Sequence, residues 1–171
     1  AVLGKAGDSD TLAVISEAFR GGCRRVVGYR LGAAAGAAKA TVKLKDTTAE
    51  SAKEVVELEA LYGGARGNDF FVKIQDSLMD DSKRELLLYE GVTLRQTVEF
   101  AKGASGSGEP ASLVAAITAS NSPWVTAKVL NDGGNKIMAT VAQAELKNGA
   151  NPTTDGDAYS AALAAIEATD W

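Results

Sequence analysis

The sequence of 171 residues contains no histidine, a single cysteine and only three prolines. Without histidine, the chain has no imidazole for a Ser-His-Asp or Cys-His nucleophile pair, for the commonest zinc sites, or for a proximal haem ligand. One cysteine cannot form an intrachain disulfide, and we expect Cys23 to be a small, buried, apolar residue rather than a nucleophile. Chemistry based on carboxylate, lysine or serine side chains remains open.

Long apolar runs are also missing. No run approaches the 18 or more residues that a transmembrane helix needs. The first five residues, Ala1 to Lys5, are too short and too soon interrupted by charge to serve as the apolar region of a signal peptide. We therefore expect a soluble chain with no membrane anchor.

The chain is weakly acidic, with 18 Lys and Arg residues against 22 Asp and Glu residues and a net charge of −4. A nucleic-acid-binding domain would normally be basic, so we expect no nucleic acid as a partner. The charge is uneven, because residues 1–45 carry a net +5 and residues 46–171 a net −9. A solvated charged face is the simplest interpretation, but the asymmetry also suits a surface that meets copies of itself head to tail.

Both ends of the chain have helical patterns. Residues 8–10 supply capping side chains, apolar residues then recur at helical spacing, and Gly21-Gly22 end the segment. A β-rich run over residues 24–31 predicts a strand after this helix. Residues 153–155 predict the cap of a second helix, with Tyr159, Leu163 and Ile166 on one face.

The middle of the chain reads as antiparallel strands. Alternation predicts strands over residues 40–45 and 56–62, and three hairpins turn at residues 63–69, 79–82 and 131–134. Further strands are predicted for the segments 70–75, 85–90, 92–100, 124–130 and 137–141, and a short helix for 112–120 after a flexible connection at 103–110.

These elements predict an α+β fold. A partial α/β layer, residues 1–33 and 147–171, is interrupted by an inserted antiparallel β-rich domain, residues 34–146.

No motif selects a catalytic, metal or cofactor site. The segment 32–41 lacks the spacing of a phosphate-binding loop and is read as a linker, and the turn at 63–69 joins strands rather than a strand to a helix. Asp155-Gly156-Asp157 lacks the remaining ligands of a calcium loop, so helix capping explains Asp155 more simply. Residues 20–30, which we call the basic segment, carry four arginines that can bind an anion or form an interface: Arg20, Arg24, Arg25 and Arg30.

Three segments, in order, resemble contractile phage tail sheath proteins. The first is residues 3–31, where a helix feeds a run ending Tyr29-Arg30-Leu31. The second is residues 58–70, where an aromatic residue and a glycine-rich turn with Gly67-Asn68-Asp69 precede a strand. The third is residues 146–153 with the helix behind them, although Asn148-Gly149 and Asn151 stand where that family has glycines.

The resemblance implies a structural protein, not an enzyme, with no catalytic residue and no cofactor. Sheath subunits form helical rings around a tail tube, and contraction drives the tube through a cell envelope. The expected partners are other sheath subunits and the tube, and the expected location is the virion, assembled in the host cytoplasm. Because complete sheath subunits are longer, we expect a fragment that lacks their linking arms and can remain monomeric. We expect the interface to include Arg24, Arg25 and Arg30, opposite an acidic patch within residues 46–99 of a neighbour.

Two other functions remain open from the residues alone. A β-rich binding or adhesion module would need a concave aromatic groove. A small α/β enzyme independent of histidine would need a carboxylate or lysine with a strongly perturbed pKa in a pocket.

Overall fold

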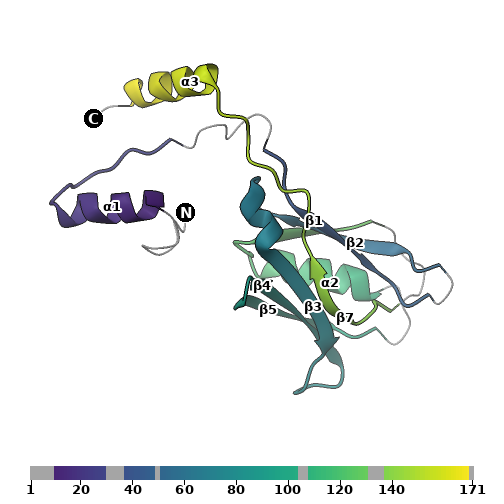
Figure 1. The fold of residues 1–171 in the computed structure, drawn as a ribbon. Helices are drawn as coiled ribbons and strands as arrows, with labels where there is room; N and C mark the ends of the chain where they lie inside the picture. The colour runs from purple at the N-terminus through teal and green to yellow at the C-terminus, as the bar shows by residue number, and fades with distance from the viewer. Residues whose placement is uncertain (1–9, 30–36, 49–50, 104–107, 131–136, 170–171) are drawn as a thin grey trace. The chain divides into compact units, whose positions relative to one another are not determined.

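The computed structural model describes residues 10–29, 37–48, 51–103, 108–130 and 137–169. Helices and antiparallel sheets occur together in one chain, which confirms the predicted α+β class (Figure 1). The chain divides into two compact units. The smaller unit comprises residues 1–32 and 154–171, and the larger, the β unit, comprises residues 33–153.

Seven strands of the β unit form two antiparallel sheets. The three-stranded sheet has the order β1-β2-β6, and the four-stranded sheet the order β5-β4-β3-β7. The strands are β1 (Thr41–Lys45), β2 (Glu54–Ala60), β3 (Phe70–Asp76), β4 (Lys83–Glu90), β5 (Thr93–Ala101), β6 (Val125–Val129) and β7 (Val141–Glu145). A 3-10 helix, η1 (Ala65–Asp69), lies between β2 and β3.

One hydrophobic core lies between the two sheets. Alternate residues of β2 and β4 are buried, as two-residue side-chain periodicity requires, and they include Leu58, Leu86 and Leu88. Helix α2 (Gly108–Ala119) packs against β5 and β6 and adds Leu113 and Ile117 to the same core. The helix thereby covers the side of the core where these two edge strands are not paired to each other.

The smaller unit contains two helices that match the sequence patterns. Helix α1 (Asp10–Arg20) ends before Gly22, whose φ of 94° suits glycine at a helix terminus. Helix α3 (Gly156–Glu167) begins after Asp155, whose carboxylate accepts a hydrogen bond from the Ala158 backbone N–H at 2.9 Å. The predicted capping role of Asp155 is confirmed.

Two predictions for the basic segment are wrong. Residues 23–29 are irregular rather than a strand, and Arg30 and Leu31 lie outside the described residues. A β-rich composition makes a strand only where another strand offers its hydrogen bonds, and no strand pairs with residues 23–29 in the described chain. Cys23 is exposed rather than buried, and its thiol donates to the Arg25 carbonyl at 2.9 Å.

Two of the three predicted hairpins are also wrong, although β2, β3 and β6 form where strands were predicted. The turn at residues 79–82 joins paired strands, β3 and β4, as predicted. Residues 63–69 instead carry the chain from β2 in one sheet to β3 in the other, and β6 and β7 likewise belong to different sheets. Turn residues mark a change of direction, but they do not determine which sheet receives the next strand.

Helix α2 and the last strand of the β unit begin at other residues than the sequence patterns predict. Helix α2 begins at Gly108 rather than at residue 112, because Pro110 in its first turn needs no hydrogen-bonded N–H. The strand predicted at 137–141 is wrong except for its last residue, because β7 covers Val141–Glu145 and Met138 forms only a single bridge with Asp46. The turn predicted at residues 131–134 lies outside the described residues.

Candidate interaction surfaces

The predicted interface arginines lie in the irregular segment that follows α1. Arg24 and Arg25 are exposed and form no ion pair with the described residues, whereas Arg20 pairs with Glu17 at 2.7 Å. Arg30 lies outside the described residues. Among the described residues, no carboxylate therefore neutralises Arg24 or Arg25.

Two of the recognisable sequence segments meet in one structural feature, which we call the Asn68 clasp. It comprises residues 63–69 and the backbone segments 38–41 and 147–151. The Asn68 side chain donates to the Gly149 carbonyl and accepts from the Gly149 N–H, both at 2.8 Å. Asn151 Oδ1 accepts from the Ala65 N–H at 2.9 Å, and Ala38 accepts from the Gly64 N–H at 2.9 Å.

Backbone pairing completes the clasp. Ala38 and Ala150 exchange two hydrogen bonds of 3.0 and 3.1 Å, and Thr41 and Lys147 exchange two of 2.8 and 2.9 Å. The segment before β1 and the segment after β7 are therefore held side by side at the place where the chain enters and leaves the β unit.

The structure explains Asn148 and Asn151, which stand where the sheath family has glycines. Asn148 has a φ of 69°, a left-handed conformation that asparagine tolerates better than most residues. Asn151 uses its side chain as a hydrogen-bond acceptor in the clasp. Sequence reasoning singled out Asn68 and Asn151 only through family resemblance, and it assigned neither one a contact.

The 3-10 helix η1 is also held to the four-stranded sheet, because the Glu90 carboxylate of β4 lies between Arg66 of η1 and Arg95 of β5. Glu90 accepts from Arg66 Nε at 2.6 Å and from Arg95 Nε at 2.7 Å. These hydrogen bonds, that from Arg66 foremost, hold the pKa of Glu90 below its ordinary value although partial burial opposes them. Both guanidinium groups also lie over the Trp124 ring, at 5.9 and 5.2 Å from its centroid.

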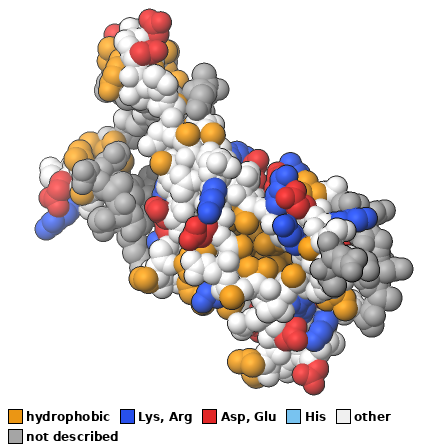
Figure 2. Space-filling view, turned by 45° about the vertical axis from the view of Figure 1, so that its right-hand side comes forward, with side chains coloured by type: hydrophobic (Ala, Val, Ile, Leu, Met, Phe, Trp, Pro, Cys, Tyr) orange, Lys and Arg blue, Asp and Glu red, His pale blue; other side chains and the backbone are white. Residues whose placement is uncertain are grey.

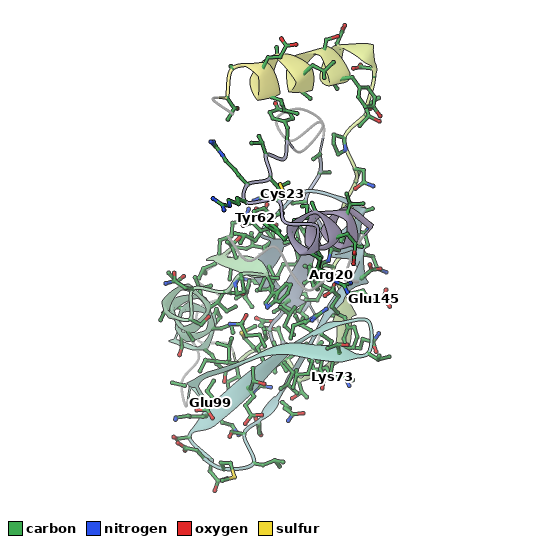
Figure 3. The ribbon with its side chains drawn as sticks, turned by 90° about the vertical axis from the view of Figure 1, so that its left-hand side faces the viewer. Arg20, Cys23, Tyr62, Lys73, Glu99 and Glu145 are labelled. Carbon is green, nitrogen blue, oxygen red and sulfur yellow. The ribbon has the colours of Figure 1, made fainter. Side chains whose placement is uncertain are left out.

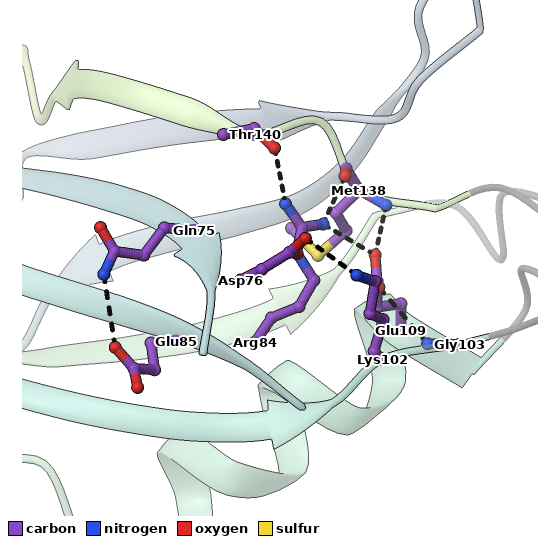
Figure 4. Close-up of polar contacts among 9 residues, drawn as sticks. All are labelled: Gln75, Asp76, Arg84, Glu85, Lys102, Gly103, Glu109, Met138 and Thr140. Carbon is purple, nitrogen blue, oxygen red and sulfur yellow. Dashed lines mark hydrogen bonds and ion pairs between the residues drawn. The ribbon is translucent and has the colours of Figure 1, made fainter. Parts of the chain in front are cut away.

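A buried polar cluster lies at the opposite end of β4 (Figure 4). The Arg84 side chain is 2% exposed and lies 3.2 Å from Glu109, which is fully buried. Arg84 also donates to the Met138 carbonyl at 2.6 Å and to the Thr140 hydroxyl at 3.0 Å. The cluster therefore links β4, α2 and the segment before β7.

The outer members of this cluster balance its charge. Arg84 Nε lies 3.1 Å from Asp76, without hydrogen-bond alignment, and Lys102 lies 2.8 Å from the same carboxylate. The Lys102 hydrogen bond lowers the pKa of Asp76. The sequence spacing predicts the burial of Arg84, because Arg84, Leu86 and Leu88 alternate along β4 and therefore lie on the same face.

The other face of the four-stranded sheet carries half-buried side chains along β3 and β4. Phe71 and Tyr89 stack there across β3 and β4, with ring centroids 4.9 Å apart, and Lys73 Nζ lies 5.8 and 5.1 Å from the two centroids. Lys73, Glu99 and Glu145 are labelled in Figure 3 and come from β3, β5 and β7. The two rings thus cover each other in a stacked pair.

The turn between β3 and β4 has the most exposed pair of adjacent apolar residues among those described. Leu78 and Met79 are each 91% exposed and are followed by Asp80 and Asp81. At the lower end of Figure 2, where this turn lies, hydrophobic side chains stand beside acidic ones. The turn predicted at residues 79–82 includes this acidic pair, but nothing in the sequence pattern predicted that Leu78 and Met79 would be exposed.

Most acidic side chains of residues 46–99 form ion pairs within the β unit. The carboxylates with an ion pair inside the β unit are Glu54, Glu57, Glu59, Asp76, Asp80, Glu90 and Glu99. Asp81, in contrast, is exposed and forms no ion pair within the described chain. Within residues 46–99, Asp81 in the β3–β4 turn is therefore an acidic position that has no ion pair among the described residues.

The described residues contain no group of three or more His, Cys, Asp or Glu side chains placed to hold a metal ion. No described helix is both long and apolar enough to cross a membrane.

Two solved structures share this fold along almost the whole chain, and both are sheath tail proteins. The protein from Listeria innocua is 18% identical with a TM-score of 0.62, and the match covers 96% of this chain and 31% of that protein. The protein from Desulfitobacterium hafniense is 24% identical with a TM-score of 0.59, covering 99% of this chain and 33% of that protein. No family model matches the sequence, and no curated protein does. The chain spans about a third of the length of these relatives and has the fold of that part of a sheath tail protein, which confirms the resemblance at the level of the fold.

Proposed function

We propose that this chain is a segment of a structural subunit of a contractile phage or phage-derived tail sheath. The subunit would assemble in helical rings around the tail tube and contract to drive the tube through a cell envelope. The supporting observation is the match of 96% and 99% of the chain to sheath tail proteins from two bacteria. A structural role, rather than catalysis, accounts for side chains that are engaged in clasps, ion pairs and packing.

The proposal includes the partners and the location. Other sheath subunits and the tail tube would be the partners, and the virion would be the location after assembly in the host cytoplasm. The basic segment with Arg24, Arg25 and Arg30 would contribute to the contact between subunits. Charge-complementary contacts suit a contractile assembly because they are longer-ranged and less dependent on shape than interdigitated apolar contacts.

The test is electron microscopy of the full-length gene product that carries this sequence. We expect hollow, helically ordered tubes to form from the purified protein. Single particles at every concentration and ionic strength examined would overturn the proposal.

A charge-reversal variant tests the basic segment within the same experiment. Replacing Arg24 and Arg25 by glutamate should reduce tube formation, while Lys45→Glu, at an exposed lysine in β1, should leave it unchanged. Equal tube formation by both variants would remove the arginines from the interface.

A further inference from the structure

The turn between β3 and β4 is ordered, so the exposure of its apolar residues is built into the fold. Asp80 Oδ1 accepts from the Ser82 N–H at 2.9 Å, and the Asp80 carbonyl accepts from the Lys83 N–H at 3.0 Å. The Ser77 hydroxyl donates to Glu85 at 2.9 Å and accepts weakly from the Met79 N–H at 3.3 Å. Leu78 and Met79 are thus presented to solvent on a fixed support, which is typical of an interaction site.

The charges beside this apolar pair select the kind of partner. Asp81 is exposed and has no ion pair within the described residues, and Asp80 shares only a 3.7 Å contact with Lys83. Hydrogen bonds from Ser82 lower the pKa of Asp80, so its carboxylate stays charged at neutral pH. An anionic lipid surface attracts basic segments, so an acidic tip disfavours it. The fitting partner is a protein surface with apolar and basic side chains together.

Such a surface occurs in the chain itself. Arg24 and Arg25 are exposed and have no ion pair with described residues, and Phe19 and Val26, which flank them in the sequence, are 50% and 37% exposed. The basic segment lies in the smaller unit and the tip in the β unit, so the two are different surfaces.

We propose that the tip of the β3–β4 turn, residues 77–82, docks on residues 19–26 of a second copy of the chain. Leu78 and Met79 would contact Phe19 and Val26, and the two carboxylates would pair with Arg24 and Arg25. Because the surfaces differ, the contact is head to tail and repeats from copy to copy into a ring or an open helix. The inference rests on the proposed function and names the surface that the basic segment meets.

Cys23 provides a direct test, because it lies inside the basic segment and is exposed. Introducing Met79→Cys into the full-length gene product places a second thiol at the tip. A short bismaleimide, which joins two thiols, should then link copies through Cys23 and the introduced cysteine into a ladder of dimers, trimers and longer chains. The ladder should disappear when Cys23→Ser is added.

Val92 supplies the matched control, because it is 99% exposed in the β4–β5 turn, at the other end of β4. Val92→Cys should give no ladder that depends on Cys23. A ladder equal to that of Met79→Cys would mean that collision, not docking, brings the thiols together, and would overturn the inference.

The outcomes separate the inference from the proposed function. If tubes form but no Cys23-dependent ladder appears with Met79→Cys, the docking is wrong while the sheath function stands. If no tubes form, the sheath proposal fails, and linking in concentrated solution still decides whether the tip meets the basic segment.

Charge exchange gives a second, independent measurement. Asp80→Lys with Asp81→Lys should raise the protein concentration needed for assembly by about tenfold or more, since tenfold corresponds to about 1.4 kcal/mol per contact. Adding Arg24→Glu and Arg25→Glu to the same chain should restore assembly, because the charges are complementary again. Absence of any restoration would contradict the pairing.

Discussion

Gly149 is the residue at which the Asn68 clasp leaves least room for a side chain. A Cβ built there would lie 2.5 Å from the Gly64 carbonyl oxygen, a backbone atom, and 3.0 Å from Asn68 Oδ1. We therefore expect Gly149→Ala to lower the free energy of unfolding by about 1–3 kcal/mol, the usual effect of overpacking. Urea unfolding measures the change.

Gly108 offers a matched control in the same unit. It begins α2, and a Cβ there meets no atom within 4 Å. Gly108→Ala should leave stability equal or slightly higher, because alanine favours helix. Equal losses for both variants would show that the clasp does not require the close approach at Gly149.

The stability that the Glu90 carboxylate adds should depend on pH. Arginine contacts lower the pKa of Glu90 in the folded chain relative to an ordinary value of 4.5. A depressed folded pKa adds stability that is fully present above the unfolded pKa and disappears as the pH falls through the folded pKa. Glu90→Gln should therefore cost about 1–2 kcal/mol at pH 7, since a charged hydrogen bond contributes this order and Arg66 is half exposed.

The difference between Glu90→Gln and the original chain should shrink as the pH falls below about 4.5, where the carboxylate takes up a proton. Urea unfolding at several pH values between 3 and 7 measures it. A difference that stays constant with pH would mean that Glu90 acts through packing rather than charge.

The buried ion pair of Arg84 and Glu109 joins the beginning of β4 to the beginning of α2. Removing one partner leaves the other charge buried, so Glu109→Leu alone should cost about 3–5 kcal/mol. Replacing both, with Arg84→Met and Glu109→Leu, should cost clearly less than the two single changes added together. Urea unfolding of the four proteins of this double-mutant cycle measures the coupling.

An exposed pair serves as the comparison for this cycle. Lys43 and Glu54 lie 2.8 Å apart, with both side chains more than two-fifths exposed. Exchanging them for Met and Leu should change stability little and additively, because solvent screens the pair. Additive costs at Arg84 and Glu109 as well would contradict a buried charge coupling.

Sequence patterns predicted which segments become elements better than how those elements pair. Alternation of apolar and polar residues located β1 and β2, and the segments between predicted turns located β3, β4 and β5. In β3 and β4, buried residues alternate with half-buried ones. Partners depend on contacts far along the chain, and β3 pairs with both β4 and β7. The run at residues 24–29 shows the converse, since local β propensity without a partner strand gives irregular backbone.

Candidate interaction surfaces were predictable only in part. The charge asymmetry pointed to the basic segment, and exposed Arg24 and Arg25 fit that prediction without testing it. Counting charges did not show that most carboxylates of residues 46–99 form ion pairs within the β unit. Nor could it show the exposure of Leu78 and Met79, because a sequence does not tell an apolar pair in a turn from one that folds inward.

For the whole molecule, the division into two units predicts independent folding of the larger one. All residues of the continuous core lie between Ala40 and Leu146, and the clasp that closes the unit uses residues 38–41, 63–69 and 147–151. Residues 33–153 expressed alone should therefore unfold in one cooperative transition, with a midpoint within a few degrees of that of the 171-residue chain. Circular dichroism during heating measures both midpoints.

The same experiment tests the domain boundaries predicted from the sequence, 34 and 146. A shorter piece, residues 34–146, keeps all strands of both sheets but loses the Ala38–Ala150 and Thr41–Lys147 pairings and the Asn68–Gly149 contact. It should melt at a lower temperature than residues 33–153, because these hydrogen bonds join the chain segments at the entry and exit of the unit. Equal midpoints for the two pieces would show that the clasp adds no stability, and its function would then lie in fixing the direction in which the two segments leave the β unit.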